Sequence, residues 1–129
     1  MERTEDISDE DWYKIKMTKG IKYDQEKIRI DLIPPELIEQ VGKILTLGLK
    51  KYEERNWECG MDWGRYYGAL QRHLWSWWKG EDKDPETNES HLSHAACCLA
   101  FLIAYEQRQI GKDTRNKIKG NKENVKKTE

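Results

Sequence analysis

The sequence predicts an all-α fold, and three observations support this class. Charged residues make up 36% of the 129 residues and prolines number only three, so helix formers are abundant and helix breakers are few. Three long segments repeat apolar residues at helical spacing. Six Trp and six Tyr supply the large side chains that a modest core needs. A chain of this length fits one domain, since domains commonly have about 100–150 residues.

Two charged ends flank the predicted domain. Residues 2–11 contain six acidic residues and one Arg, whereas residues 111–129 contain seven Lys or Arg and three acidic residues. Segments of this polarity bury too little apolar surface to order themselves. We therefore expect an acidic, flexible segment over residues 1–20, a helical domain over residues 21–110 and a basic, disordered tail over residues 111–129.

The first element of the domain is a short strand or extended arm at residues 28–33, where apolar and polar residues alternate. Pro34 and Pro35 end it and begin the first helix, because proline is tolerated in the first helical turn. We expect this helix to run from about Pro35 to Glu53. Its apolar residues recur at helical spacing and are Leu37, Val41, Ile44, Leu45 and Leu49.

Two further helices follow a loop at residues 56–60. Asp62 is a suitable N-cap for the second helix, and Gly80 is a natural residue just beyond its end. A polar loop then runs from Gly80 to Ser90, and the third helix extends from about His91 to Gln109. Three helices form a thin core for an independent domain. We therefore expect oligomerisation, to a homodimer or a larger bundle, to complete it.

The overall charge, the apolar runs and the cysteines indicate which partners and which cellular compartment to expect. The formal net charge is −1, which gives no general argument for binding a nucleic acid or a membrane. No apolar run approaches the roughly 20 residues that span a bilayer. The three cysteines are Cys59, Cys97 and Cys98; their odd number argues against an exported disulfide framework. The expected location is the cytoplasm.

All three histidines lie between Arg72 and His94, together with several carboxylates, and this cluster predicts a metal site. On a helix, His91 and His94 share one face, because residues three apart are neighbours. Imidazoles and carboxylates are ordinary ligands of divalent ions. The alternative is that these histidines are hydrogen-bonded core or rim residues. We expect a divalent ion held by His73, His91 and His94 with Glu81 or Asp84 or, failing that, one phosphate group bound by the three histidines.

A set of motifs in fixed order resembles the phage-type dATP/dGTP diphosphohydrolase family over about residues 22–106. These motifs include Lys22-Tyr-Asp24, Arg29-Ile-Asp-Leu-Ile-Pro-Pro-Glu36, Lys51-Tyr52, Arg55-Asn-Trp-Glu58, Arg72-His-Leu74, Gly80-Glu-Asp82, Asp84-Pro-Glu86 and His91-Leu-x-His-Ala95. The resemblance implies metal-dependent hydrolysis of a purine deoxynucleoside triphosphate, dATP or dGTP, to monophosphate and pyrophosphate.

The resemblance also implies a MazG-like helical bundle. MazG-like pyrophosphatases hold Mg²⁺ with E-E-x-x-E on one helix and E-x-x-D on the next. Alignment at the Gly80 turn places His91 and His94 at the second motif and His73 near the last Glu of the first. The remaining positions of the first motif fall near residues 68–70, which are not acidic. Histidine ligands would favour Mn²⁺, Co²⁺ or Zn²⁺ over Mg²⁺.

The candidate catalytic residues are the carboxylates Glu81 and Asp84, which would act at the ion. The candidate substrate-binding residues are cations for the phosphates, with an amide and an aromatic ring for the purine. They are Lys50, Lys51, Arg55, Asn56, Trp57 and Arg72. Lys50 and Lys51 are equally suited to a solvated helix face, Arg72 to an ion pair with the acidic loop, and Trp57 to the core.

Two other functions remain open at this point. One is an HD-type nucleotide phosphohydrolase, although the adjacent His-Asp pair of that class is absent from the sequence. The other is a non-catalytic phage protein that sequesters a nucleotide signal. The absence of carboxylates at residues 68–70 favours this second alternative.

Overall fold

The structure is a computed structural model of the chain and describes residues 6–18, 20 and 25–118. These residues form helices and no strand, so the prediction of an all-α protein is confirmed. The chain divides into two compact units, Met1–Leu32 and Ile33–Glu129, and each is described by itself. No helix among the described residues is both long enough and apolar enough to cross a membrane.

The first unit contains a helix in the acidic segment that we expected to be flexible. This helix, α1, spans Asp9–Thr18 and carries three acidic residues in its first turn, where they interact favourably with the helix dipole. The hydroxyl of Ser8 accepts a hydrogen bond from the backbone N–H of Asp11 at 3.2 Å. This is the bond that an N-cap residue makes, and it explains why the helix begins here.

The prediction of a strand at residues 28–33 is wrong. Residues Ile30–Leu32 form a short 3-10 helix, η1. The described residues offer no partner strand, and Arg29 pairs with Asp31 at 2.8 Å within the same turn. Residues 21–24 of the expected arm lie outside the described residues.

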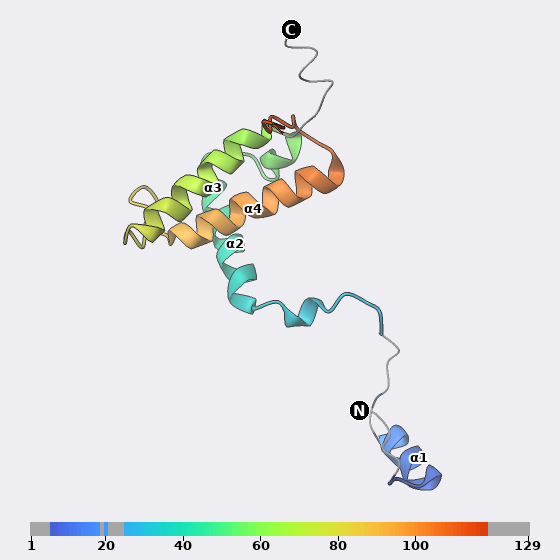
Figure 1. Ribbon diagram of the computed structural model, residues 1–129. Coiled ribbons are helices and arrows are strands. Elements are labelled where there is room, and N and C mark those ends of the chain that lie inside the picture. The colour runs from blue at the N-terminus through green and yellow to red at the C-terminus, as the bar shows by residue number, and fades with distance from the viewer. Residues whose placement is uncertain (1–5, 19, 21–24, 119–129) are drawn as a thin grey trace. The chain divides into compact units, whose positions relative to one another are not determined.

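The second unit is built from three helices and a short 3-10 helix (Figure 1). These elements are α2 at Pro35–Gly48, η2 at Asn56–Cys59, α3 at Trp63–Trp78 and α4 at His91–Arg108. Helix α4 packs against both α3 and α2. It runs antiparallel to α3, because Tyr66 meets Phe101 at one end while His73 meets His91 at the other.

Helix α2 ends at Gly48 and not at the predicted Glu53. The carbonyl of Gly48 accepts hydrogen bonds from the N–H groups of Lys51 and Tyr52, at 3.0 and 2.8 Å. Residues 49–51 form hydrogen-bonded turns in place of regular helix, although the apolar pattern includes Leu49.

The start of α3 is capped by a distant segment. Asp62 occupies the N-cap position, but its side chain makes no capping hydrogen bond. The N–H of Trp63 donates instead to the carbonyl of Lys112 at 2.9 Å, and the N–H of Gly64 donates to the hydroxyl of Thr114 at 2.9 Å. The first residues of the expected tail are therefore held against α3, which differs from the disordered tail expected from residue 111 onward. Residues 119–129 lie outside the described residues.

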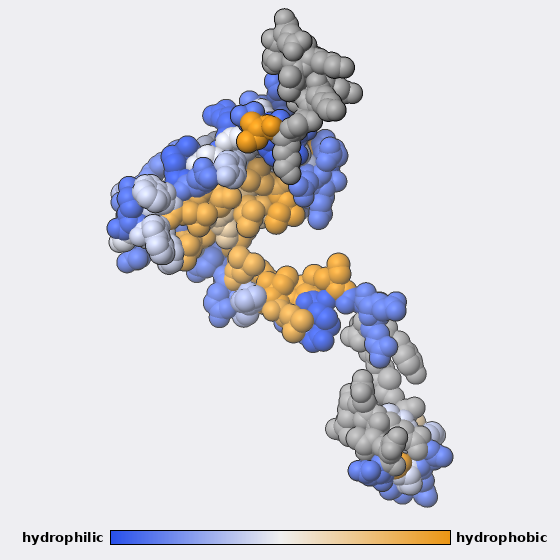
Figure 2. Space-filling view, in the orientation of Figure 1, coloured by the Kyte–Doolittle hydropathy of each residue, from blue (hydrophilic) through white to orange (hydrophobic). Residues whose placement is uncertain are grey.

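An aromatic cluster forms the core between α3, α4 and η2. Tyr105 is fully buried, and its hydroxyl donates a hydrogen bond to the carbonyl of Trp57 at 2.5 Å. The ring of Trp57 stacks on Phe101 with centroids 4.8 Å apart, and Tyr66 contacts Phe101 at 5.0 Å. Many other large apolar side chains of this unit remain exposed (Figure 2). They include Leu37, Ile38, Leu49, Leu74, Trp75, Trp78, Leu92, Leu99 and Ile103.

Candidate functional site

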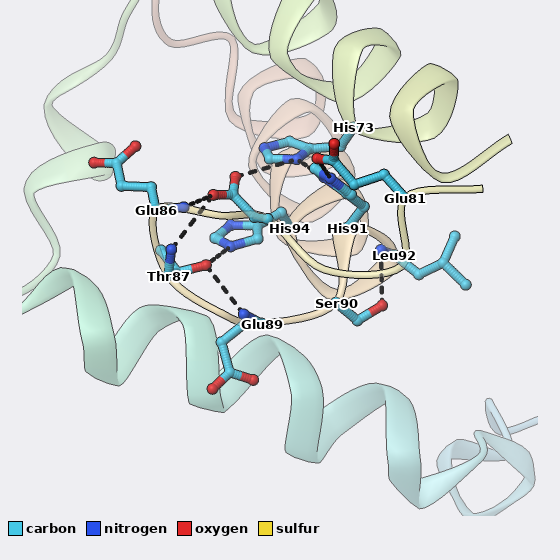
Figure 3. A network of polar contacts seen from close by, with 10 residues as sticks. His73, Glu81, Glu86, Thr87, Glu89, Ser90, His91, Leu92 and His94 are labelled. Carbon is cyan, nitrogen blue, oxygen red and sulfur yellow. Dashed lines mark hydrogen bonds and ion pairs between the residues drawn. The ribbon is translucent and has the colours of Figure 1, made fainter. Parts of the chain in front are cut away.

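The loop between α3 and α4 brings a carboxylate to the histidines (Figure 3). Gly80, at a φ of 101°, follows the end of α3. The side chain of Asp84 then accepts hydrogen bonds from the N–H groups of Glu86 and Thr87, at 2.7 and 3.4 Å. These bonds form a local turn that fixes the position of the Asp84 carboxylate.

Three candidate ligands come together, one each from α3, the loop and α4. The Nδ1 atoms of His73 and His91 lie 2.9 Å apart, and His73 Nδ1 lies 3.8 Å from an oxygen of Asp84. Ligand atoms of all three residues lie within 4.8 Å of one another. Two ligands that bind one ion at about 2.1 Å and at right angles are themselves about 3.0 Å apart. The residues therefore fit a divalent ion, and we call His73, Asp84 and His91 the histidine centre.

Glu81 contacts the other ring nitrogen of His91. Its Oε1 atom lies 2.6 Å from Nε2 of His91. Because an ionised carboxylate only accepts hydrogen bonds, Nε2 carries the proton and Nδ1 presents its lone pair to the histidine centre. In metal sites a carboxylate placed in this way fixes the tautomer and the ring orientation of the ligand. The structure thus places Glu81 behind His91, and not among the three grouped ligands.

His94 lies beside the histidine centre. Its ring stacks on His73, with centroids 4.7 Å apart and an interplanar angle of 8°. Its Nε2 atom lies 2.7 Å from the hydroxyl of Thr87. His94 is therefore not one of the three grouped ligands, although it supports the ring of His73.

The charge states suit a metal site. Burial, followed by the proximity of other histidines, lowers the pKa of His73, and burial lowers the pKa of His94. Burial alone would raise the pKa of Asp84, but hydrogen bonds from the N–H groups of Glu86 and Thr87 outweigh it and the pKa is lowered. These shifts favour uncharged rings at His73 and His94 and an ionised carboxylate at Asp84 near neutral pH, and neutral imidazole and ionised carboxylate are the forms that bind a cation.

A pocket of about 580 Å³, which we call the α2–α3 pocket, opens between α2, η2 and α3 with α4 as its floor. Three of the candidate substrate-binding residues line it: Asn56, Trp57 and Arg72. Lys50, Lys51 and Arg55 are not among its lining residues. Lys51 pairs with Glu86 at 3.2 Å, and Arg55 lies 3.5 Å from Glu58.

Trp57 belongs mainly to the core. Besides stacking on Phe101, its ring lies 5.2 Å from the guanidinium of Arg108, and its carbonyl accepts the hydrogen bond from Tyr105. Trp57 is nevertheless only partly buried and lines the α2–α3 pocket, so its stacking on a base stays a prediction.

Sequence reasoning missed two groups of residues at this site. Glu53 and Arg65 also line the α2–α3 pocket. Arg65 and Arg72 are seven residues apart, and this spacing of about two helical turns places them on one face of a helix. That signal was available in the sequence. The contact of Thr87 with His94 had no sequence signal, because it depends on how the loop folds.

Comparison with known proteins identifies similar chains. The family described as dATP/dGTP diphosphohydrolase, N-terminal, matches residues 17–115. A dATP/dGTP diphosphohydrolase of Salmonella phage PMBT28 is 40% identical over 84 residues, which cover 65% of this chain and 29% of that protein. The chain therefore spans less than a third of the length of this relative. No solved structure matches the chain, and the expected likeness to MazG-like bundles stays a prediction.

Proposed function

Because this chain belongs to the dATP/dGTP diphosphohydrolase N-terminal family, we propose that it acts in the metal-dependent hydrolysis of dATP or dGTP to monophosphate and pyrophosphate. The relative from Salmonella phage PMBT28 carries this substrate pair in its name. The observation that supports the proposal best is the histidine centre, which lies inside the matched residues 17–115.

The reaction breaks the bond between the α-phosphorus and the oxygen that bridges to the β-phosphorus. The oxygen of a water molecule forms the new bond to the α-phosphorus, and pyrophosphate leaves. A bound divalent ion makes hydroxide available near neutral pH and offsets the negative charge of the phosphates. His73, Asp84 and His91 would hold Mn²⁺, Co²⁺, Zn²⁺ or Mg²⁺, and their two nitrogen ligands favour the first three.

Glu81 and Asp84 have different roles in this proposal. Asp84 supplies a negative ligand whose position is fixed by the backbone N–H groups of the loop. Glu81 is a positioning residue that acts through His91, since it accepts the proton of the outer ring nitrogen. Arg72 provides positive charge next to His73 in the sequence and lines the α2–α3 pocket.

Product analysis tests this function. Purified protein is incubated with dATP or dGTP and Mg²⁺, Mn²⁺, Co²⁺ or Zn²⁺, and the nucleotides are separated by chromatography. We expect dAMP or dGMP together with pyrophosphate, and no product from His91→Ala. Recovery of intact nucleotide with every metal would contradict the proposed hydrolysis.

A second candidate is a non-catalytic protein that sequesters a nucleotide. The residues Gly68, Ala69 and Leu70 favour it, because they carry no carboxylate at the part of α3 where MazG-like enzymes are expected to hold Mg²⁺. In that case the same incubation would leave intact nucleotide bound to the protein in stoichiometric amount, and heating the protein would release it.

We also propose that the chain self-associates. The second unit leaves large apolar side chains exposed on each of its three helices, for example Leu37, Trp75 and Ile103, and such surfaces usually contact a partner. Light scattering at micromolar concentration should show a dimer or a larger assembly, and a compact monomer would contradict this proposal. The described cysteines are all free, which suits a reducing compartment such as the cytoplasm.

A further inference from the structure

The α2–α3 pocket contains positive charge that the described residues do not neutralise. Arg65 and Arg72 line the pocket, and neither forms an ion pair within the described part of the chain. The other arginines of that part each pair with a carboxylate at 2.7–3.5 Å: they are Arg29, Arg55, Arg108 and Arg115. Two arginines without an acidic partner in one pocket indicate a ligand with negative charge or with strong hydrogen-bond acceptors.

The pocket lies next to the histidine centre along two of the helices that line it, α4 and α3. On α4, Cys97 and Phe101 line the pocket and lie on the same face as His94, at spacings of three and seven residues. On α3, Arg72 lines the pocket and directly precedes His73. Seven residues of helix correspond to about 10 Å, so the pocket begins within one helical turn of the histidines and extends away from them.

The part of the pocket remote from the histidines offers groups that match a guanine base. Arg65 presents paired donors, which suit the O6 and N7 acceptors of guanine. Glu53 presents a carboxylate, which accepts hydrogen bonds from donors such as the amino group of guanine. Adenine has an amino group in place of O6, and this donor would oppose the arginine. Glu53 and Arg65 form no ion pair with each other within the described residues, so both remain available.

The size and composition of the pocket suit the remainder of a nucleoside. Its volume of about 580 Å³ lies within the range of about 300–1,000 Å³ that is typical of small-molecule sites. Apolar side chains form much of its wall, including Ile44, Leu45, Leu49 and Phe101. Sites for small molecules commonly combine such a wall with a few polar groups that set the orientation of the ligand.

We propose that the α2–α3 pocket binds the base and sugar of a guanine deoxynucleotide, with Glu53 and Arg65 at the base and with the phosphates directed past Arg72 to the histidine centre. This proposal rests on the proposed function, which it extends by naming the preferred base and the residues that select it. It also assigns to Arg65 a role that differs from the phosphate contact of Arg72.

Two glycines of α2 provide a matched pair of variants for the test. Gly48 lines the pocket, whereas Gly42 lies on the same helix and does not line it. A Cβ atom added at either position meets no atom within 4 Å, so the fold can accept a side chain at both. Gly48→Phe should fill the pocket, and Gly42→Phe should leave it open.

The probe is the α,β-methylene analogue of dGTP, which cannot be split between the α and β phosphates. Its affinity is measured by equilibrium dialysis in the presence of Mn²⁺. We expect Gly48→Phe to weaken binding by roughly tenfold or more and Gly42→Phe to leave it unchanged. Calorimetric titration should give wild-type Mn²⁺ affinity for both variants, which shows that the histidine centre is intact.

A second variant tests the choice of base. Arg65→Met should reduce the preference for the dGTP analogue over the corresponding dATP analogue, because the donors to O6 and N7 are lost. Wild-type affinity and wild-type preference in Gly48→Phe and Arg65→Met would overturn the pocket assignment. If dGTP is then still hydrolysed, the proposed function survives without this pocket. If the analogue binds in the predicted way but dGTP remains intact, the pocket assignment stands and the proposed hydrolysis fails.

Discussion

The histidine centre and the α2–α3 pocket lie next to each other but differ in how completely their polar groups are satisfied. In the histidine centre, hydrogen bonds from the loop hold Asp84 and Glu81 holds His91, and beside the centre Thr87 contacts His94. In the pocket, Arg65 and Arg72 have no carboxylate partner among the described residues. The first region is preorganised, whereas the second leaves charge available.

This difference indicates two kinds of ligand. A small ion requires ligand atoms in fixed positions, and hydrogen bonds around the ligands provide that rigidity. A nucleotide carries several phosphates and a base, so a pocket that binds it needs unpaired donors and open space. This difference agrees with our proposal of one substrate whose phosphates meet an ion and whose base lies about two helical turns away.

The largest expected effect concerns the chemistry of Cys97, which lines the α2–α3 pocket. Burial raises the pKa of this thiol from 9.0 to about 12. Only the thiolate reacts with thiol reagents. At any pH below 9 the fraction of Cys97 present as thiolate should therefore be roughly a thousandfold smaller than for an ordinary thiol, and the rate of labelling of Cys97 should rise with pH. Labelling with a thiol reagent at pH 8, read by mass spectrometry, should modify the exposed Cys59 and spare Cys97. Rapid labelling of Cys97 would show that the pocket floor is not closed.

The next largest effect is expected for the proposed ligands of the ion. His91→Ala removes a buried candidate ligand and should weaken Mn²⁺ binding by more than about a hundredfold. His94→Ala should have a smaller effect, because the Nε2 atom of His94 is engaged by Thr87 and His94 is not one of the grouped ligands. Calorimetric titration of Mn²⁺ compares the two variants. An equal loss of Mn²⁺ affinity in both variants would indicate that His94 is also a ligand of the ion.

Glu81→Gln tests the support behind the histidine centre. An amide can donate as well as accept, so it no longer fixes the proton on Nε2 of His91. We expect a loss of roughly 10–100-fold in Mn²⁺ affinity with the fold retained. Asp82→Asn is the matched control, since the neighbouring Asp82 side chain is exposed and contacts no histidine. If both variants bind Mn²⁺ like the wild type, Glu81 does not position His91.

The smallest effect is expected at the start of α3, which forms one wall of the pocket. Thr114→Val removes the hydroxyl that accepts the N–H of Gly64. Loss of such a cap costs about 1 kcal/mol in the free energy of unfolding, which urea denaturation can measure. Mn²⁺ affinity should not change, because the histidine centre lies toward the other end of α3. Unchanged stability would mean that the hydroxyl of Thr114 does not stabilise the start of α3.

The sequence predicted the elements that depend on local pattern. Helices α2, α3 and α4 were expected from apolar residues at helical spacing, and α2 and α4 start at Pro35 and His91 as predicted. The end of α2 was misplaced because the apolar pattern continues after Gly48. The cap of α3 could not be found locally, because Thr114 comes from fifty residues further along the chain.

In the candidate site, too, some features follow from the local sequence and others depend on the tertiary structure. The histidines and the acidic loop were apparent from composition and spacing, and the structure brings His73, Asp84 and His91 together. Their individual roles were not apparent. Whether a carboxylate binds an ion or orients a ligand depends on distances of 2.6 and 3.8 Å, which only the folded loop determines. In the same way, the lack of a partner for Arg65 is a property of the tertiary structure.

The central claim is that an ion at the histidine centre and a nucleotide in the α2–α3 pocket act together. Steady-state kinetics of dGTP hydrolysis in the presence of Mn²⁺, which give kcat and KM separately, test this claim most directly. Wild-type protein, His91→Ala and Gly48→Phe are compared. We predict that His91→Ala loses kcat, whereas Gly48→Phe raises KM by roughly tenfold with little change in kcat. Intact dGTP with the wild-type protein, or full activity in His91→Ala, would contradict the account.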